Sequence, residues 1–310
     1  MGENLLSESQ QNALLALSQF GAAISFVGSL GVLFMFTRFE RLRKLSFTLV
    51  AWLAFADLGA DISYFLGDAE DGTALCTAQA VMGQFFQLAQ VFWTVCIANV
   101  LYDITTRMRM YHHQDQSRLL WRYHGFVWGT ALVFTLLPFT TDNYGNSGGW
   151  CWISTTDKVE FDAGTAWRYF SFYIPLWTAV AYNIYVYVGI TGLIKRFMVG
   201  VHGGDDGHPR VAPSAEQQER MQKFVRRLVF YPLVLVGCWT FPTINRIANS
   251  VNPNQPVFAL YVLHAFSVGL QGFLNAVVYG MTDTVQEAAG ALACIRMCKR
   301  RGGGGGAGGG

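Results

Sequence analysis

The chain has 310 residues, of which 52% are hydrophobic and only 14% charged, and its mean hydropathy is +0.28. A soluble domain of this length carries about a quarter charged residues, so the composition excludes an ordinary soluble protein. The formal net charge is only +2. Basic residues occur in short groups between long neutral segments, which excludes a basic nucleic-acid-binding face and is typical of a helical protein that crosses a membrane several times.

The first 37 residues divide into a polar start and a first apolar segment. Residues 1–13 contain neither a basic region nor a small-residue cleavage site, so we expect a short extracellular segment there rather than a signal peptide. A helix needs about 20 apolar residues to cross a bilayer, and residues 14–37 satisfy this. Gly21, Gly28 and Gly31 within the segment would permit close contact with other helices.

The second predicted span covers residues 45–66 and contains two acidic residues, Asp57 and Asp61. They lie four residues apart and therefore on one helix face. Ionisable side chains inside a bilayer are costly, so each is a candidate for a functional role.

The third predicted span, 76–106, also contains polar side chains, including Asn99. Near its inner end, Asp103 and Arg107 are four residues apart and are expected to form an ion pair. A fourth span is predicted at 123–139, followed by a polar loop at about 140–165.

Prolines mark the fifth and sixth predicted spans. The fifth covers 166–194 and includes Pro175, and the sixth, 226–246, contains Pro232 and Pro242. Proline would be a heavy liability in a water-soluble helix, but membrane helices tolerate it and bend there.

Trp239, Thr243 and Arg246 follow one another in the sixth span at spacings of four and three, so they share one helix face. We expect this face to border a polar cavity. An anionic ligand there would need cations such as Arg246 and Arg168. The alternative is that these side chains extend to the interfacial water; for Arg168 and Lys158 the second interpretation is favoured.

The seventh predicted span, 256–281, has a stripe of polar residues, His264, Gln271, Asn275 and Tyr279, at spacings of seven, four and four. His264 is a candidate ligand contact, together with the sixth-span face and Arg168. Gln271, Asn275 and Tyr279, with Asp57, Asn99 and Asn245, are candidates for a buried switch network. The alternative is that these groups only join helices through hydrogen bonds, which we favour over direct ligand contact for Asn99, Gln271 and Asn275.

Residues 282–301 predict a short amphipathic helix on the membrane surface, and the glycine-rich segment 302–310 is expected to be disordered. Cys294 and Cys298 lie in the predicted helix. They are candidates for S-palmitoylation, and plain thiols are the equal alternative.

The distribution of basic residues predicts the orientation. Of the 22 Lys and Arg residues, only Lys158, Arg168 and Arg246 fall on the amino-terminal side of the predicted spans. Lys and Arg concentrate in cytoplasmic loops, so the amino terminus is predicted outside and the carboxyl terminus inside.

Two of the six cysteines, Cys76 and Cys151, fall on the predicted outer side. Disulfides form in oxidising compartments, so a bridge is chemically permitted and would pin the outer loop over the bundle; the alternative is two unpaired thiols. We favour the bridge because the other cysteines lie in spans or inside. Cys96 and Cys238 are expected to be small core residues.

Six segments together resemble the slime-mould cyclic AMP receptor family of G-protein-coupled receptors. They are RLRKLSF, LAFADLGAD, FWTVCIANVLY, GWCWI, YPLVLVGCWTFPTINRI and LQGFLNAVVYG. The resemblance covers residues 38–280 and rests on their order and spacing. It implies a seven-helix receptor of the plasma membrane with the Cys76–Cys151 bridge and with Trp239 at the base of a ligand cavity.

The same resemblance implies an extracellular small-molecule ligand, cyclic AMP in one branch, and a heterotrimeric G protein as partner. Candidate G-protein contacts are Asp103, Arg107, Arg226 and Arg227. Neither an enzyme nor a cofactor or metal is expected. The chain departs from rhodopsin-like receptors because Tyr102-Asp103-Ile104 stands where they have Asp-Arg-Tyr, and no Asn-Pro pair precedes Tyr279.

Three other classes compete with this hypothesis. A retinal protein needs a lysine in the seventh span, and residues 256–281 contain none. An intramembrane enzyme is disfavoured because no HExxH motif occurs in the sequence and no paired aspartates in separate spans form a recognisable catalytic motif. A transporter of a small polar solute remains the alternative, although no internal repeat supports it.

Overall fold

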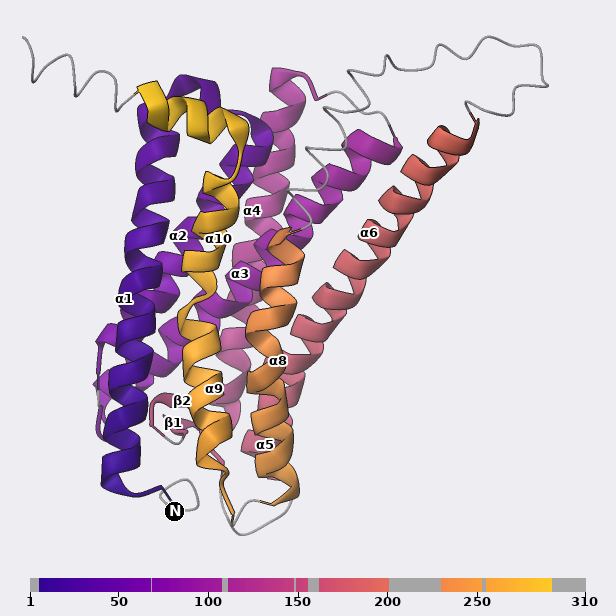
Figure 1. The fold of residues 1–310 in the computed structure, drawn as a ribbon. Coiled ribbons are helices and arrows are strands. Elements are labelled where there is room, and N and C mark those ends of the chain that lie inside the picture. The colour runs from indigo at the N-terminus through magenta and orange to yellow at the C-terminus, as the bar shows by residue number, and fades with distance from the viewer. Residues whose placement is uncertain are drawn as a thin grey trace, which may run out of the picture.

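The computed structural model describes residues 6–67, 69–107, 111–147, 149–155, 162–200, 230–252 and 255–291. Long helices form a bundle (Figure 1) in the order α1 (Glu8–Arg38), α2 (Leu45–Phe65), α3 (Ala74–Thr106), α4 (His113–Leu136), α6 (Ile174–Gly200), α8 (Phe230–Val251), α9 (Phe258–Gly269) and α10 (Gln271–Gly280). The shorter elements are η2 (Glu40–Leu42), η3 (Leu137–Thr141), β1 (Tyr144–Asn146), β2 (Cys151–Ile153), α5 (Ala163–Arg168) and η4 (Tyr169–Tyr173).

The two ends of the bundle differ. The start of α1, the β1–β2 hairpin and α5 lie at one end, which we call the hairpin end (Figure 1). Residues 283–291 form a further helix that lies across the opposite end. Val285 and Ala288 of this helix are buried. The remainder of the amphipathic helix predicted at 282–301, with Cys294 and Cys298, lies outside the described residues.

Five helical segments of the described chain are long and apolar enough to cross a membrane: Glu8–Arg38, Leu45–Phe65, Ala74–Thr106, Ala163–Leu193 and Phe258–Gly280. They correspond to the predicted first, second, third, fifth and seventh spans. Large apolar side chains on their outer surfaces are exposed, for example Val27 at 70%, Ile184 at 54% and Phe55 at 44%. Continuous apolar surface of this kind marks a face that contacts lipid, so the protein is a membrane protein with several spans.

The predicted fourth and sixth spans form helices, but they do not belong to this apolar group. The fourth begins ten residues earlier than expected, at His113, and its first turns carry polar and charged side chains such as Asp115, Arg118 and Arg122. In the sixth span the structure describes α8 only from Phe230 onward, so Arg226 and Arg227 lie outside the described residues.

The first helix also begins earlier than predicted. Ser7 caps α1: its side chain accepts a hydrogen bond from the Gln10 amide, and the Gln10 side chain accepts one from the Ser7 amide. This reciprocal capping box satisfies two free amides at the helix start. The polar residues assigned to an extracellular segment are therefore helical from Glu8 onward, because capping compensates for the lack of apolar side chains.

Pro175 shapes the fifth helix. Its ring cannot donate a hydrogen bond to the carbonyl four residues earlier, which belongs to Ser171. The helix widens into the π-helical turn η4 just before this proline, and Gln84 Nε2 of α3 donates to the Ser171 carbonyl at 3.3 Å. A buried glutamine thus replaces the hydrogen bond that proline removes.

The predicted seventh span is interrupted at Leu270, between α9 and α10. Gly269 and Gly272 flank the interruption, and glycine is a weak helix former. A side chain added at Gly21 of α1 would come within 3.1 Å of the Gly269 backbone, and one at Gly28 within 3.1 Å of the Ala276 side chain. The prediction of close glycine contacts is therefore confirmed for Gly21 and Gly28, whereas a side chain added at Gly31 would meet nothing within 4 Å among the described residues.

Candidate functional site

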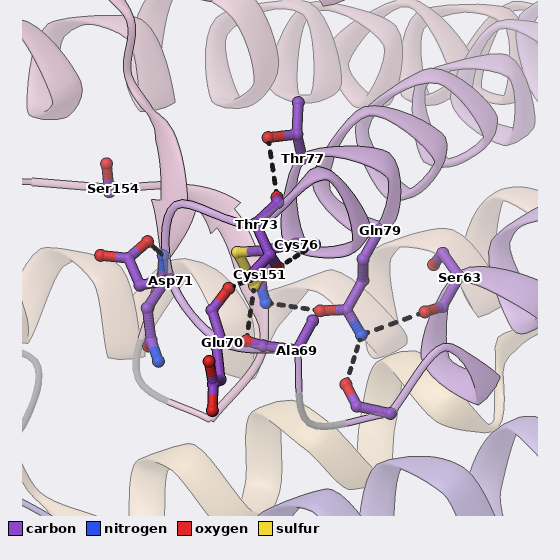
Figure 2. Close-up of a disulfide and its surroundings, with 12 residues drawn as sticks. Ser63, Ala69, Glu70, Asp71, Thr73, Cys76, Thr77, Gln79, Cys151 and Ser154 are labelled. Atoms are coloured by element: carbon purple, nitrogen blue, oxygen red, sulfur yellow. Dashed lines mark hydrogen bonds between the residues drawn. A yellow bond between two sulfur atoms is a disulfide. The ribbon is translucent and has the colours of Figure 1, made fainter.

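The hairpin in the predicted polar loop is tied to the third helix by a disulfide between Cys76 and Cys151, which confirms the predicted bridge. The strands pair in the register Asn146↔Cys151. Figure 2 shows that Gln79 of α3 connects the disulfide to α2. Its Oε1 accepts a hydrogen bond from the Cys151 amide at 2.8 Å, and its Nε2 donates one to the Ser63 carbonyl at 3.1 Å. Asp71 Oδ1 accepts a hydrogen bond from the Asn146 amide at 2.9 Å.

The loop between the strands is tight. The Ser147 amide donates to the Trp150 carbonyl at 2.8 Å, and Gly149 has a φ of +114°, which favours glycine. At the base of the hairpin, the Tyr144 hydroxyl donates to the Thr135 carbonyl at 2.7 Å. Burial raises the pKa of the Tyr144 phenol, so this hydroxyl remains a donor.

Two arginines converge on Ser147, which is fully buried. Arg168 donates to Ser147 Oγ at 2.8 Å and to the Ile153 carbonyl at 2.7 Å. Arg246 donates to the same Oγ at 3.0 Å and to the Ser147 carbonyl at 3.2 Å. Since Arg168 is 5% exposed and Arg246 2%, neither extends to interfacial water. The sequence favoured an Arg168 side chain that extends to interfacial water. That interpretation was wrong, because the hairpin folds over Arg168 and buries it.

Aromatic rings surround the Arg246 guanidinium. Its central carbon lies 5.6 Å from the Trp150 ring centre, 5.5 Å from that of Trp152 and 5.9 Å from that of Tyr261. A cation within about 6 Å of an aromatic face is attracted by the ring electrons. The hairpin therefore supplies both hydrogen bonds and ring contacts to this cation.

Beneath the hairpin lies a small cavity. Its lining residues are Ser63, Tyr64, Gln79, Gly83, Gln87, Trp150, Cys151, Trp152, Tyr173, Trp239 and His264. The space holds roughly one or two water molecules, so the hairpin nearly fills it. Arg168 and Arg246 do not line it themselves; they contact the tryptophan rings that do.

Gln84 joins the hairpin to the helices. This fully buried side chain accepts a hydrogen bond from the Trp152 indole at 2.7 Å and donates to both Ser171 oxygens, the carbonyl at 3.3 Å and the hydroxyl at 3.2 Å. Any movement of Trp152 out of the cavity must therefore break a contact with α3.

At the base of the cavity, Trp239 connects the sixth and seventh helices. Its indole donates to Gln271 Oε1 at 2.8 Å, and Gln271 Nε2 donates in turn to Gln90 Oε1 at 3.2 Å. The Phe172 ring packs against Trp239 with centres 4.7 Å apart. Nearer the hairpin, the Asn245 amide lies 3.2 Å from His264 Nδ1.

A second group of polar side chains lies where α1, α2 and α10 meet. Asn275 Nδ2 donates to Asp57 Oδ2 at 3.1 Å, and Ser25 Oγ donates to Asp61 Oδ2 at 2.8 Å. All four side chains are buried. A carboxylate taken out of water is costly unless hydrogen bonds satisfy it, so these donors are required for the two acidic residues to lie there.

At the end of α3 farther from the hairpin, the predicted ion pair is confirmed. Arg107 Nη1 lies 2.9 Å from Asp103 Oδ1, and the Tyr111 hydroxyl donates to Asp103 Oδ2 at 2.5 Å. Among the described residues, no group of three His, Cys, Asp or Glu side chains is placed to hold a metal ion.

Comparison with known proteins identifies the family. A family model described as "Slime mold cyclic AMP receptor" matches residues 5–286. The chain belongs to the slime mold cyclic AMP receptor family. It is 32% identical over 283 residues to "G-protein coupled receptor 1" of Arabidopsis thaliana, covering 91% of this chain and 82% of that protein.

Other relatives of this cyclic AMP receptor family member are more distant. "Cyclic AMP receptor-like protein A" of Dictyostelium discoideum is 26% identical over 89% of this chain and 66% of its own length. "G-protein coupled receptor 157" of Homo sapiens is 26% identical over 87% of this chain and 79% of its own length. These relatives carry receptor names, and none of them supports the transporter alternative.

For this family member, the structure brings together part of the ligand set predicted from sequence. Trp239 and His264 line the cavity, and Arg168 and Arg246 lie behind the tryptophans of the hairpin. Thr243 lies elsewhere: it accepts a hydrogen bond from the Trp177 indole at 3.2 Å and does not line the cavity. Helix spacing put Thr243 on the same face of α8 as Trp239 and Arg246, but Trp177 of α6 covers Thr243.

The predicted polar network divides into separate groups. Asn275 binds Asp57, Asn245 binds His264, and Gln271 binds Trp239. Asn99 belongs to none of these three groups. Its side chain donates a hydrogen bond to the Tyr123 hydroxyl at 2.7 Å and accepts one from the Tyr182 hydroxyl at 3.1 Å. Tyr279 is 2% exposed and packs edge-on against Phe47.

Sequence reasoning missed several residues that build the site, above all Ser147, Gln79 and Tyr173. The glutamines of α3 offered a signal, because Gln79, Gln84, Gln87 and Gln90 recur at spacings of five, three and three in an apolar helix. All four are buried. No comparable pattern marks Ser147.

Proposed function

We propose that this protein is a seven-span receptor of the plasma membrane that binds an anionic small molecule at its hairpin end and activates a heterotrimeric G protein inside the cell. Family membership supports the receptor part, and some relatives are named cyclic AMP receptors. The ligand part rests on one observation: Arg168 and Arg246, from different helices, converge on Ser147. Arginine pairs of this kind are suited to phosphate and carboxylate groups.

In this proposal, α4 and α8 complete the membrane-crossing set. Both are helices of more than 20 residues, and the surrounding protein compensates for their polar side chains. The hairpin end faces outward because a disulfide requires an oxidising compartment and because cations are scarce there. The helix at 283–291 then lies on the inner membrane surface, with Cys294 and Cys298 available for lipidation.

The hairpin acts as a lid in this proposal. Since the cavity beneath it holds only about one or two water molecules, a ligand must displace Trp150 and Trp152. An anionic oxygen can then replace Ser147 as the acceptor for both guanidiniums. Ligand binding thus favours a conformation with the hairpin raised, and it shifts the population only by its difference in affinity for the two conformations.

Trp239 is positioned to transmit this change. It touches the cavity on one side and hydrogen-bonds Gln271 on the other, so movement of the hairpin alters the contact between α8 and α9–α10. We assign Asp57, Asn275 and Tyr279 to the same switch, Asn245 and His264 to its outer part, and Asn99 to a site nearer the inner end. Asp103, Arg107, Arg226 and Arg227 are the proposed G-protein contacts.

Ligand binding is tested with purified protein in lipid nanodiscs and tritiated cyclic AMP, with 5′-AMP as a second anion and adenosine as the uncharged control. We expect binding of an anionic nucleotide and none of adenosine. Arg246→Gln is expected to weaken binding by about 10- to 100-fold, because a charge-assisted hydrogen bond is lost. Arg41→Gln, at the opposite end, is the matched control. Equal binding by Arg246→Gln and the unmodified protein contradicts the proposed site.

Coupling is tested separately by guanine-nucleotide exchange on purified Gα subunits mixed with the reconstituted protein. The receptor proposal predicts faster exchange, increased further by a ligand from the binding experiment. Arg107→Ala is expected to reduce exchange without changing ligand binding. If exchange is never faster than with empty nanodiscs, with or without ligand, the coupling proposal is wrong.

A further inference from the structure

A second cavity lies between α3, α6 and α8, far from the hairpin. Its lining residues are Ala98, Leu101, Val180, Asn183, Ile184, Val186, Tyr187, Pro232, Leu233 and Val236. Leu101 lies 25 residues beyond Cys76 on α3, which is roughly 37 Å along the helix. The space has room for roughly four or five water molecules, more than the cavity under the hairpin.

The walls of this cavity are apolar and one side faces lipid. Leu101, Val180 and Val186 form buried walls, whereas Ile184 and Leu233 on the rim are 54% and 56% exposed. Figure 1 shows α6 leaning away from α8 toward the inner end of the bundle. A molecule dissolved in the bilayer therefore reaches this cavity without passing through water.

Asn183 is the exception among these walls. It is 2% exposed, and its Nδ2 donates to the Ala179 carbonyl at 2.7 Å. Its Oδ1 is buried and has no hydrogen-bond partner in the described part of the chain. A buried acceptor left without a donor is costly, and the bilayer core supplies no water to satisfy it.

A trapped water molecule is poorly suited to donate the hydrogen bond that Asn183 Oδ1 lacks. A buried water needs two to four polar partners, and among the described lining residues only Asn183 and Tyr187 contribute polar side-chain atoms. A molecule with a hydrocarbon body and a single donor matches the walls better. Its body packs on the apolar side chains, and its donor satisfies Asn183.

We propose that this cavity binds a membrane alcohol, with its hydroxyl donating to Asn183 Oδ1 and its hydrocarbon chain extending between Ile184 and Leu233 into the bilayer. The site lies apart from the hairpin cavity and is independent of the proposed ligand and of G-protein coupling. Its occupant separates α6 from α8 and so favours conformations in which these helices stay apart.

The proposal is tested by photolabelling purified protein in phosphatidylcholine nanodiscs. The probes are a long-chain alcohol that carries a diazirine and the methyl ether of the same molecule, which lacks the donor. We expect the alcohol to label α6 and α8 peptides roughly three- to tenfold more than the ether, the effect of one hydrogen bond. Asn183→Leu should reduce alcohol labelling to the ether level, whereas Thr191→Val, on the same helix outside the cavity, should leave the preference intact.

A competition experiment on the unmodified protein keeps the test independent of folding defects in the variants. Unlabelled alcohol should suppress the labelling, and an alkane of equal length should not. Leu233→Trp, which fills the mouth of the cavity and retains Asn183, should reduce labelling by both probes. Equal labelling by alcohol and ether in the unmodified protein, or an alcohol preference that survives Asn183→Leu, overturns the proposal.

Discussion

Asp57 illustrates how single polar residues are held inside this bundle. It is fully buried on α2, and Asn275 of α10 donates to one of its oxygens at 3.1 Å. Ser25 of α1 supports Asp61 one turn away. Each acidic residue thus depends on one donor from another helix, and the same bonds that satisfy the carboxyl groups hold α1, α2 and α10 in register.

We predict that Asn275→Leu destabilises the protein by about 1–3 kcal/mol, because it leaves a buried carboxyl group without its donor. In the Asp57→Leu background the same substitution should cost less, with a coupling free energy of about 0.5–2 kcal/mol between the two positions. Thermal unfolding of the four proteins in one detergent measures this cycle. Strictly additive effects would show that the Asp57–Asn275 bond contributes nothing.

Among the elements, the hairpin and the interrupted seventh helix matter most for the site. The hairpin has only three residues in each strand and cannot be stable alone. The disulfide, Gln79 and the two arginines hold it on the bundle. The interruption between α9 and α10 serves a different purpose, since it lets Gly272 approach α1 and α2 where no side chain would fit.

Loss of the bridge should loosen the hairpin. We predict that Cys76→Ser and Cys151→Ser each lower stability by roughly 2–4 kcal/mol, and that the double variant is no worse than either single variant, because both remove the same bond. Thermal unfolding with and without a reducing agent checks this. Reductant should lower the melting temperature of the unmodified protein and leave that of the double variant unchanged; an equal effect on both would contradict the prediction.

The close approach at Gly272 gives a second prediction. A methyl group there would meet Ser25 Oγ, and would lie 2.9 Å from Ser29 Oγ and 3.0 Å from Asp57 Cβ, so Gly272→Ala should destabilise by about 1–3 kcal/mol through overpacking.

Gly280→Ala is the matched control on the same helix, because no described residue lies within 4 Å of its added methyl group. Alanine is the better helix former, so this variant should be neutral or slightly stabilising in the same unfolding experiment. Similar losses from both alanine variants would show that helix propensity, rather than contact with α1, determines the effect.

For the whole molecule, the two ends of the bundle have different chemistry. The hairpin end has the disulfide and two buried arginines. The opposite end has the Asp103–Arg107 pair and the helix at 283–291. This polarity fits a receptor that receives a signal at one membrane face and passes it on at the other, provided that the chain crosses the bilayer an odd number of times.

An epitope tag before residue 1 should therefore bind antibody on intact cells, whereas a tag after residue 310 should bind only after permeabilisation. The reason is the positive-inside distribution of Lys and Arg. A cytoplasmic marker protein serves as the permeabilisation control. Both tags accessible on intact cells, or both hidden, would contradict an odd number of spans.

The sequence alone predicted lipid as the surrounding solvent, most helix positions, the Cys76–Cys151 bridge and the Asp103–Arg107 pair. These depend on composition, on runs of neighbouring residues or on a choice among few cysteines, all of which can be read locally. It also located a face with Trp239 and Arg246, although helix spacing could not show that α6 covers Thr243.

Only the tertiary structure decided which polar groups meet. Arg246 and Ser147 are 99 residues apart in the chain, and Asp57 and Asn275 are 218 apart. No local pattern predicts such pairs, because each polar residue in an apolar helix has several candidate partners. Packing of the helices and folding of the hairpin select the partners, and in doing so they bury Arg168 and divide the polar network. They also leave Asn183 Oδ1 without a donor within the described part of the chain.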